Sequence, residues 1–180
     1  MELAKHVLLK KEGKMNLKKW VLALGLIISS RVFAEGALHA HEHGSIDFEV
    51  AVEGKTAEFA MKGPAESFIG FEHAAKTAKE KKVLADTASM WNTNFFELIS
   101  FDKNLNCTTS MAKFEHIMDK GNHSEIEAGI KVTCEKDLKA TKISVNLRSY
   151  FKKIKNLKME IVGSETRAIK ITKPKMDVTL

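Results

Sequence analysis

The sequence predicts an α+β fold in which antiparallel sheets carry their helices on one side. A stretch of alternating apolar and polar residues indicates a β-hairpin at 45–62, and a segment with helical periodicity follows it. The order of hairpin, helix and strand then occurs a second time in the C-terminal half. We therefore predict helices segregated against antiparallel sheet, with two similar lobes at about 45–102 and 103–180 as a hypothesis about topology.

The first hairpin is predicted from its side-chain alternation. Apolar residues alternate with charged ones along both arms, which is the period of a half-buried strand. Glu53 and Gly54 are expected to form the tight turn between the arms. The Gly63-Pro64 pair should end the second arm.

A helix is predicted to begin at Thr77. Glu80 follows this threonine by three residues, which is the spacing of a capping box, and an apolar face runs from Val83 to Trp91. The next element is expected to be a strand at 96–101. The C-terminal half is predicted to contain strands near 107–118 and 124–135, a helix near 147–155, a strand at 157–162 and a final edge strand at 168–172.

The first 34 residues are predicted to be an export signal. Lys18 and Lys19 precede an apolar run at 20–30, and Ala34 closes a cleavage site of small residues. The apolar run is short for a membrane span, so no stable membrane insertion is expected after cleavage. Residues 35–180 would then be the exported domain, whether translation starts at Met1 or Met15.

The net charge of +6 and the pI near 9.2 owe much to this leader. Seven of the 29 basic residues and two of the 23 acidic ones lie in it, which leaves 22 against 21. A nucleic-acid-binding protein needs a sustained basic surface, so no nucleic-acid partner is predicted. The remaining basic run, 150–158, is interpreted as a solvated helix face.

Cys107 and Cys134 are the only cysteines. In an oxidising, exported compartment an isolated pair usually forms a disulfide, and this is our prediction. Metal binding or redox chemistry by the two thiols is the alternative, but it would favour a CxxC spacing, which the sequence lacks.

Three histidines in "HAHEHG", at 39–44, are the plainest candidates for chemistry. In an extended chain, residues two apart point to the same side about 7 Å apart, so their imidazoles can converge on Zn²⁺, Cu²⁺ or Ni²⁺. His39, His41 and His43 also share the register of the polar face of the next strand. The alternative is an N-terminal tail that is merely rich in histidine.

Other histidines have mixed interpretations. His123 and Glu125 lie on the polar face of the second hairpin, where His123 is either a ligand or a plain turn residue. His73 lies in a loop, where a structural hydrogen bond and a ligand role are equally expected. His116 shares the register of apolar neighbours and is predicted to be a partly buried structural residue.

Enzyme signatures are scarce. The sequence contains no nucleophile elbow, phosphate-binding glycine loop or HExxH motif, so no catalytic activity is predicted. A zinc hydrolase would require an open coordination position and a placed general base.

Four stretches carry a resemblance to a known family. They are "HEHGSIDFEVAVEG", "PAESFIGFEHAAKT", "HSEIEAGIKVTCE" and "LRSYFKKIKNLKMEIVG". In this order they resemble the motif blocks of exported bacterial proteins of the ZrgA-type zinc uptake family, over essentially all of 35–180. The resemblance implies a periplasmic zinc-binding protein that acts as an accessory beside a zinc-importing ABC transporter, whose periplasmic component is a possible partner.

Matching motif by motif implies zinc ligands at four positions. These are His41, His43, His73 and His123, while Cys107 and Cys134 correspond to the paired cysteines of the family. His39 and Glu125 are outer candidates. The turn "DKGNH" replaces a longer histidine- and aspartate-rich loop of some members, and Ala75 stands where proline is common. The alternative function is a non-catalytic envelope interaction module whose histidines are incidental.

Overall fold

The computed structural model describes residues 43–119 and 123–180. The predicted signal at 1–34, and with it His39 and His41, lie outside this part of the chain. Among the described residues, no helix is long and apolar enough to span a membrane.

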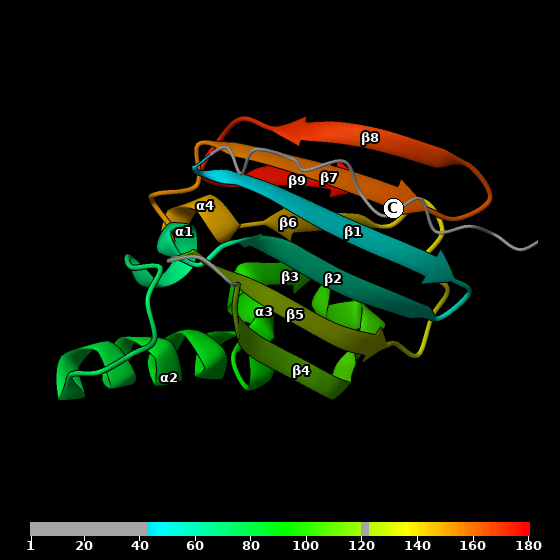
Figure 1. The fold of residues 1–180 in the computed structure, drawn as a ribbon. Helices are drawn as coiled ribbons and strands as arrows, with labels where there is room; N and C mark the ends of the chain where they lie inside the picture. The colour runs from blue at the N-terminus through cyan, green and yellow to red at the C-terminus, as the bar shows by residue number, and fades with distance from the viewer. Residues whose placement is uncertain (1–42, 120–122) are drawn as a thin grey trace, which may run out of the picture. The chain divides into compact units, whose positions relative to one another are not determined.

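A six-stranded sheet forms the larger part of the fold, in the order β4-β5-β2-β1-β7-β8 (Figure 1). Its strands are β1 (Ser45–Glu53), β2 (Thr56–Pro64), β4 (Thr108–Met118), β5 (Ser124–Thr133), β7 (Asn156–Val162) and β8 (Thr166–Ile171). Neighbouring strands are antiparallel except β1 and β7, which run parallel. Because this sheet takes strands from both predicted halves, the halves share one hydrogen-bonded framework.

A three-stranded sheet lies behind the larger one in Figure 1, in the order β3-β6-β9. It consists of β3 (Ile99–Phe101), β6 (Lys142–Val145) and β9 (Met176–Thr179). The helical elements are α1 (Glu66–Ile69), α2 (Ala78–Asn92), α3 (Phe95–Leu98), the 3₁₀ turn η2 (Lys103–Leu105) and α4 (Leu147–Tyr150). The predicted α+β class is confirmed.

The first hairpin is confirmed, with one adjustment at its turn. Glu53 pairs with Thr56, so the two turn residues are Gly54 and Lys55 rather than Glu53 and Gly54. Gly54 has a φ of +53°, a conformation that glycine adopts without steric cost. The second arm continues to Pro64, one residue beyond the predicted breaker at Gly63.

The predicted capping box at the start of α2 is also confirmed. The Thr77 hydroxyl accepts the Glu80 amide at 3.1 Å, and the Glu80 carboxylate accepts the Thr77 amide at 2.9 Å. The backbone amides of Thr77 and Lys76, which both donate to the Glu80 carboxylate, lower its pKa. The cap therefore satisfies donors that the first helical turn leaves unpaired.

Several predicted elements needed correction. Residues 95–98 form a helical turn before β3, so the strand predicted at 96–101 is shorter. The helix predicted at 147–155 is the single turn α4, because the chain then turns to bury Phe151 and Ile154. The strand predicted to be last, at 168–172, is β8, and β9 follows it. The short strand β6 was not predicted, since its pairing with β3 and β9 depends on distant residues.

The core lies on one face of the large sheet. Alternate residues of β1, β2, β5 and β7 point into it and meet buried side chains of the helices and the small sheet. Trp91 of α2 is 1% exposed, lies edge-on to Phe48 and Phe95, and donates its indole N–H to the carbonyl of Gly129 at 3.1 Å. Helix α2 is thus tied to the middle of β5.

The predicted disulfide is confirmed. Cys107 and Cys134 are bonded, with their Cα atoms 4.0 Å apart. Cys107 precedes β4 and Cys134 follows β5, directly beyond the paired residues Thr108 and Thr133. The bond therefore closes the open end of the β4–β5 pair.

Replacing both cysteines with serine should lower the free energy of unfolding by about 3 kcal/mol, because the unfolded chain regains the freedom of a 27-residue loop. Urea denaturation followed by circular dichroism measures this loss. The wild-type protein treated with reductant is the control and should lose a similar amount. A loss below about 1 kcal/mol would contradict the expected constraint on the unfolded chain.

Candidate metal centre

Four side chains of the types that bind metals lie close together at one end of the large sheet. His43 lies two residues before the start of β1, and His123 immediately precedes β5. Glu66 and Glu72 lie on α1 and in the loop after it, which follow the end of β2. Because β2 runs antiparallel to both β1 and β5, its end lies beside their starts, which brings the four segments together.

The segments are locked by backbone hydrogen bonds. The amide of Ala65 donates to the carbonyl of Ser124 at 2.8 Å, which joins α1 to the start of β5. The carbonyl of Gly44 accepts the amides of Lys155 and Asn156 at 2.9 and 3.0 Å. The residues beside His43, Glu66 and His123 therefore have fixed backbones.

The distances within the cluster suit a small metal ion. His43 Nδ1 lies 3.3 Å from Glu66 Oε2 and 3.3 Å from Glu72 Oε1. Neighbouring ligand atoms around a tetrahedral Zn²⁺ with bonds of about 2.0–2.1 Å are separated by roughly 3.3 Å. The two distances from His43 Nδ1 thus match the edges of such a tetrahedron, and the ligand atoms of His43, Glu66 and Glu72 all lie within 4.8 Å of one another.

His123 contacts the cluster through a carboxylate. Its Nδ1 lies 2.5 Å from Glu72 Oε2, and its ring centroid is 6.4 Å from that of His43. The Glu72 side chain is only 16% exposed, whereas those of His43 and His123 are 56% and 63% exposed. Glu72 is therefore the half-buried centre of the cluster, and the two imidazoles lie at its solvent side.

The donor set fits zinc chemistry. Imidazole nitrogen and carboxylate oxygen are both zinc ligands. One ligand atom from each of His43, Glu66 and Glu72 lies within 4.8 Å of the other two. Across the described ranges, 43–119 and 123–180, this is the one set of three or more such groups so closely spaced.

Lys153 contacts the same cluster from the loop before β7. Its ammonium lies 2.8 Å from Glu66 Oε1 and donates to the carbonyl of Gly70 at 3.3 Å. This ion pair lowers the pKa of Glu66. Lys153 therefore extends to lower pH the range in which Glu66 is ionised, the form that a carboxylate needs to bind a metal.

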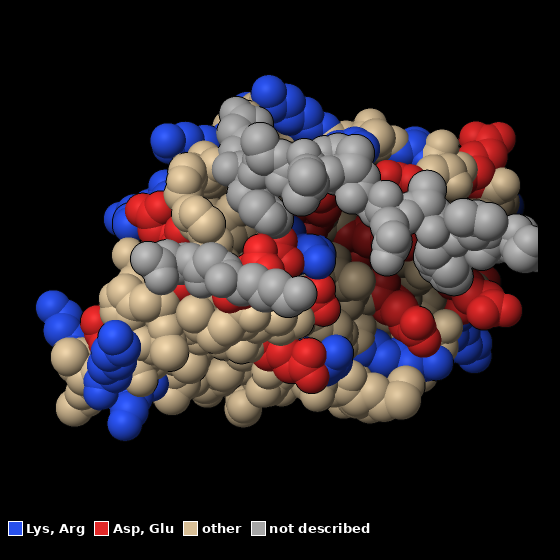
Figure 2. Space-filling view, in the orientation of Figure 1, with Lys and Arg blue, Asp and Glu red and all other residues tan. Residues whose placement is uncertain are grey.

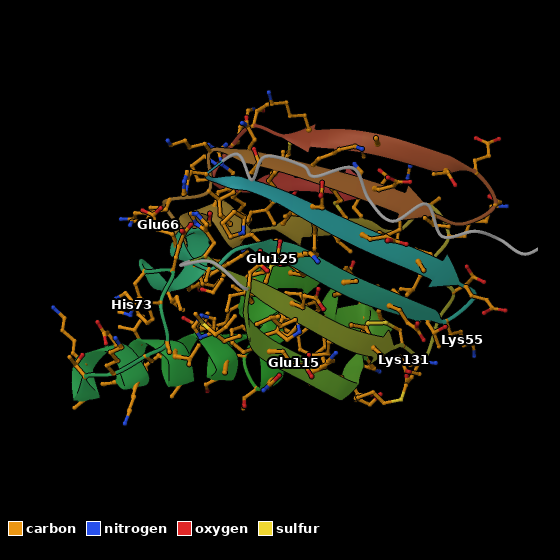
Figure 3. All side chains as sticks on the ribbon, in the orientation of Figure 1. Lys55, Glu66, His73, Glu115, Glu125 and Lys131 are labelled. Atoms are coloured by element: carbon orange, nitrogen blue, oxygen red, sulfur yellow. A yellow bond between two sulfur atoms is a disulfide. The ribbon has the colours of Figure 1, made fainter. Side chains whose placement is uncertain are left out.

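His73 interacts with α2 and not with the group of His43, Glu66 and Glu72, although the family resemblance implies a ligand role for it as well. Its Nε2 is 3.6 Å from Glu80 Oε1, and its ring stacks on Phe71. Figure 3 shows His73 beside α2 and Glu66 on α1. In this arrangement the histidine interacts with the cap of α2.

Glu125 is also engaged elsewhere. It lies 3.0 Å from the ammonium of Lys62, which is 2.9 Å from Glu127. Hydrogen bonds to Glu127 and Glu125 raise the pKa of Lys62. Charged side chains of both signs cover this outer face of the sheet (Figure 2).

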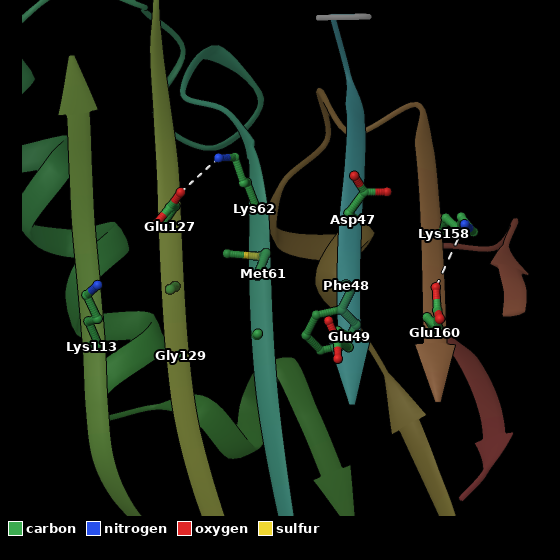
Figure 4. A pocket seen from close by; sticks show the side chains of 12 residues that line it. Asp47, Phe48, Glu49, Met61, Lys62, Lys113, Glu127, Gly129, Lys158 and Glu160 are labelled. Atoms are coloured by element: carbon green, nitrogen blue, oxygen red, sulfur yellow. Dashed lines mark hydrogen bonds and ion pairs between the residues drawn. The ribbon is translucent and has the colours of Figure 1, made fainter. Parts of the chain in front are cut away.

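The outer face contains a groove of about 660 Å³. Figure 4 shows ion pairs on both sides of it, Lys62 with Glu127 and Lys158 with Glu160. Such paired charges are typical of a solvated sheet face, and surface pairs of this kind contribute little to stability.

His116 is half-buried, as expected of a structural histidine. Its Nε2 lies 2.8 Å from the hydroxyl of Ser124. Burial, with a smaller contribution from the charge of His73, lowers the pKa of His116 below its ordinary 6.5.

His116 should make stability fall as the pH drops below 6.5. In that range the unfolded chain binds a proton that the folded protein resists, so the free energy of unfolding decreases until the pH reaches the lowered pKa. A His116→Gln variant keeps a partner for Ser124 but does not titrate, so its unfolding free energy should fall less. Urea denaturation at pH 7.5, 6.5 and 5.5 compares the two, and parallel pH dependences would contradict the assignment.

The sequence argument missed both carboxylates of the cluster. Glu72 directly precedes His73 in "GFEHA", but the block drew attention to the histidine. Glu66 follows the Gly63-Pro64 breaker, where the chain turns back toward the start of the hairpin. The predicted hairpin could have indicated Glu66, because the two arms of a hairpin run in opposite directions and the residues after β2 therefore lie beside those before β1.

An α+β domain with two imidazoles and two carboxylates at one end of its main sheet belongs to the class of candidate metal-binding proteins. The family model described as "ZrgA family zinc uptake protein" matches residues 40–180, so this chain belongs to that family. Its membership indicates a role in zinc binding or transport. No curated protein matches the sequence significantly.

Proposed function

We propose that this protein binds zinc in the periplasm and retains it or passes it to a zinc-importing ABC transporter. The observation that carries the proposal is the His43, Glu66 and Glu72 cluster, in which His43 Nδ1 lies at tetrahedral spacing from one oxygen of each carboxylate. His123 completes the group through its contact with Glu72. His41 remains a proposed ligand and His39 a proposed outer donor, and both lie outside the described residues.

Two features support an exported location. The Cys107–Cys134 disulfide is typical of oxidising compartments. The N-terminal residues have the charge and apolar pattern of an export signal.

The exposure of the site supports exchange of zinc rather than a purely structural role. Structural zinc sites are closed by four protein ligands. Here the His43 side chain is 56% exposed and that of Glu66 is 38% exposed, so an ion held between them can be reached by another protein. We therefore propose a binding and transfer function without catalysis.

Calorimetric titration of Zn²⁺ into the purified protein tests the site. Glu72→Gln should weaken zinc binding by about 10-fold or more, because a neutral amide is a poor zinc ligand. Glu160→Gln, which removes the same charge from the outer face of β7, should leave the affinity unchanged. Equal affinities for the wild type and the Glu72 variant would refute the proposed site. Zinc binding too weak to measure in the wild type would favour an envelope interaction module.

A further inference from the structure

Both carboxylates of the cluster have one oxygen occupied by a neighbouring side chain. Lys153 holds Glu66 Oε1 at 2.8 Å, and His123 holds Glu72 Oε2 at 2.5 Å. The remaining oxygens, Glu66 Oε2 and Glu72 Oε1, are the ones that lie 3.3 Å from His43 Nδ1. Each carboxylate thus presents a single oxygen toward the same point.

We propose that Lys153 is a positioning residue that keeps Glu66 a one-oxygen ligand and thereby favours Zn²⁺ over larger divalent cations. The inference rests on the proposed zinc site and concerns its selectivity. Zn²⁺ prefers four ligands at about 2.0–2.2 Å. Larger ions take more ligands at longer distances and commonly bind both oxygens of a carboxylate, as Ca²⁺ does.

The backbone that carries Lys153 is fixed. Phe151 is 8% exposed and packs edge-on against Phe68 of α1, and Ile154 is 1% exposed. The guanidinium of Arg148 donates to the carbonyl of Ile154 at 3.2 Å. The ammonium of Lys153 therefore extends toward Glu66 from an anchored loop.

This loop is also fitted closely to the residue beside His43. Gly44 has a φ of +89°, and a Cβ at this position would lie 2.9 Å from the carbonyl oxygen of Lys153. Only glycine adopts this positive φ without steric cost and also leaves room for the Lys153 carbonyl, so any other residue would displace the loop. The basic run at 150–158 thus contributes a specific contact to the metal cluster, beyond the solvated face predicted from sequence.

The positive charge of Lys153 acts on metal binding in the opposite direction to its orientation of Glu66. The charge repels any divalent cation, so removing it would by itself strengthen the binding of all such ions by a similar factor. Positioning instead predicts weaker Zn²⁺ binding and a change in preference between ions. Lys152→Met is a matched control, because it removes the same charge from the adjacent exposed position.

The test measures the affinities of the wild type, Lys153→Met and Lys152→Met for Zn²⁺ and for Cd²⁺, a larger ion with the same filled d shell. Lys153→Met should weaken Zn²⁺ binding by about 10-fold, as expected when a group that orients a ligand is lost. The ratio of the Zn²⁺ affinity to the Cd²⁺ affinity should fall by a similar factor. Lys152→Met should change neither. A Lys153 variant that shifts both affinities by the same factor would overturn the proposal.

The visible absorption of Co²⁺ at saturation gives a second measurement. Circular dichroism must first show that the variant is folded, because unbound six-coordinate Co²⁺ also absorbs weakly. Four-coordinate Co²⁺ absorbs more strongly than five- or six-coordinate Co²⁺, so Lys153→Met should reduce the absorption when Glu66 is free to bind through both oxygens. An unchanged spectrum would overturn the proposal. The Glu72→Gln titration remains a separate test of the zinc site, because it compares Zn²⁺ affinity alone.

Discussion

Replacing His43 with alanine is expected to weaken zinc binding by about 100-fold or more, since it removes a proposed direct ligand and leaves two carboxylates without the imidazole between them. His43 Nδ1 is the atom that both Glu66 and Glu72 approach at 3.3 Å. Without the His43 imidazole, Glu66 Oε2 and Glu72 Oε1 lose the nitrogen donor that lies next to both of them. Competition with a chromophoric zinc chelator measures the affinity.

The matched control is His73→Ala. Both histidines belong to the motif blocks that resemble the zinc uptake family, and their side chains are similarly exposed, at 56% and 50%. Because His73 lies beside Glu80 rather than in the cluster, its loss should change zinc affinity by less than about twofold. A larger loss of affinity in His73→Ala than in His43→Ala would show that the ligand set is wrong.

Replacing Trp91 with alanine is expected to lower the free energy of unfolding by about 3–5 kcal/mol. The indole is 1% exposed between Phe48 and Phe95, so its removal leaves a cavity where α2 meets the sheet. The carbonyl of Gly129 also loses its hydrogen-bond donor. Trp91 is the only tryptophan after residue 34, so urea denaturation should be followed by circular dichroism.

The control for this variant is Trp91→Phe, which keeps an aromatic ring but not the indole N–H. Trp91→Phe should lower the free energy of unfolding by less than Trp91→Ala does, because the phenylalanine ring fills most of the cavity. Equal losses for the two variants would show that the hydrogen bond to Gly129, rather than packing, dominates at this position.

Local patterns were sufficient for the elements whose cause is local. The alternation of β1 and β2, the capping box at Thr77 and Glu80, and the pairing of the only two cysteines were all predicted correctly. The alternation also predicted that His43 shares the face of Asp47 and Glu49, the exposed residues of β1. Here the structure differs, because β1 begins at Ser45 and Gly44 has a φ of +89°, so the strand register does not extend back to His43.

Elements that depend on distant partners were predicted less well. The turn α4 was extended into a helix because the basic residues around it resemble a helix face, whereas Phe151 and Ile154 are buried against other parts of the fold. The four-residue strand β6 has too little pattern of its own and exists through its pairing with β3 and β9. Tertiary contacts override weak local preference in both segments.

The sequence by itself determined the α+β class, the disulfide, the candidate histidines and the resemblance to a zinc uptake family. Only the tertiary structure decided which side chains meet. It joined His43 to Glu66 and Glu72, placed His123 and Lys153 on the outer oxygens of those carboxylates, and left His73 with Glu80. The reason is topological, since the antiparallel order of β1, β2 and β5 brings the start of two strands to the end of the third, and spacing along the chain does not record that meeting.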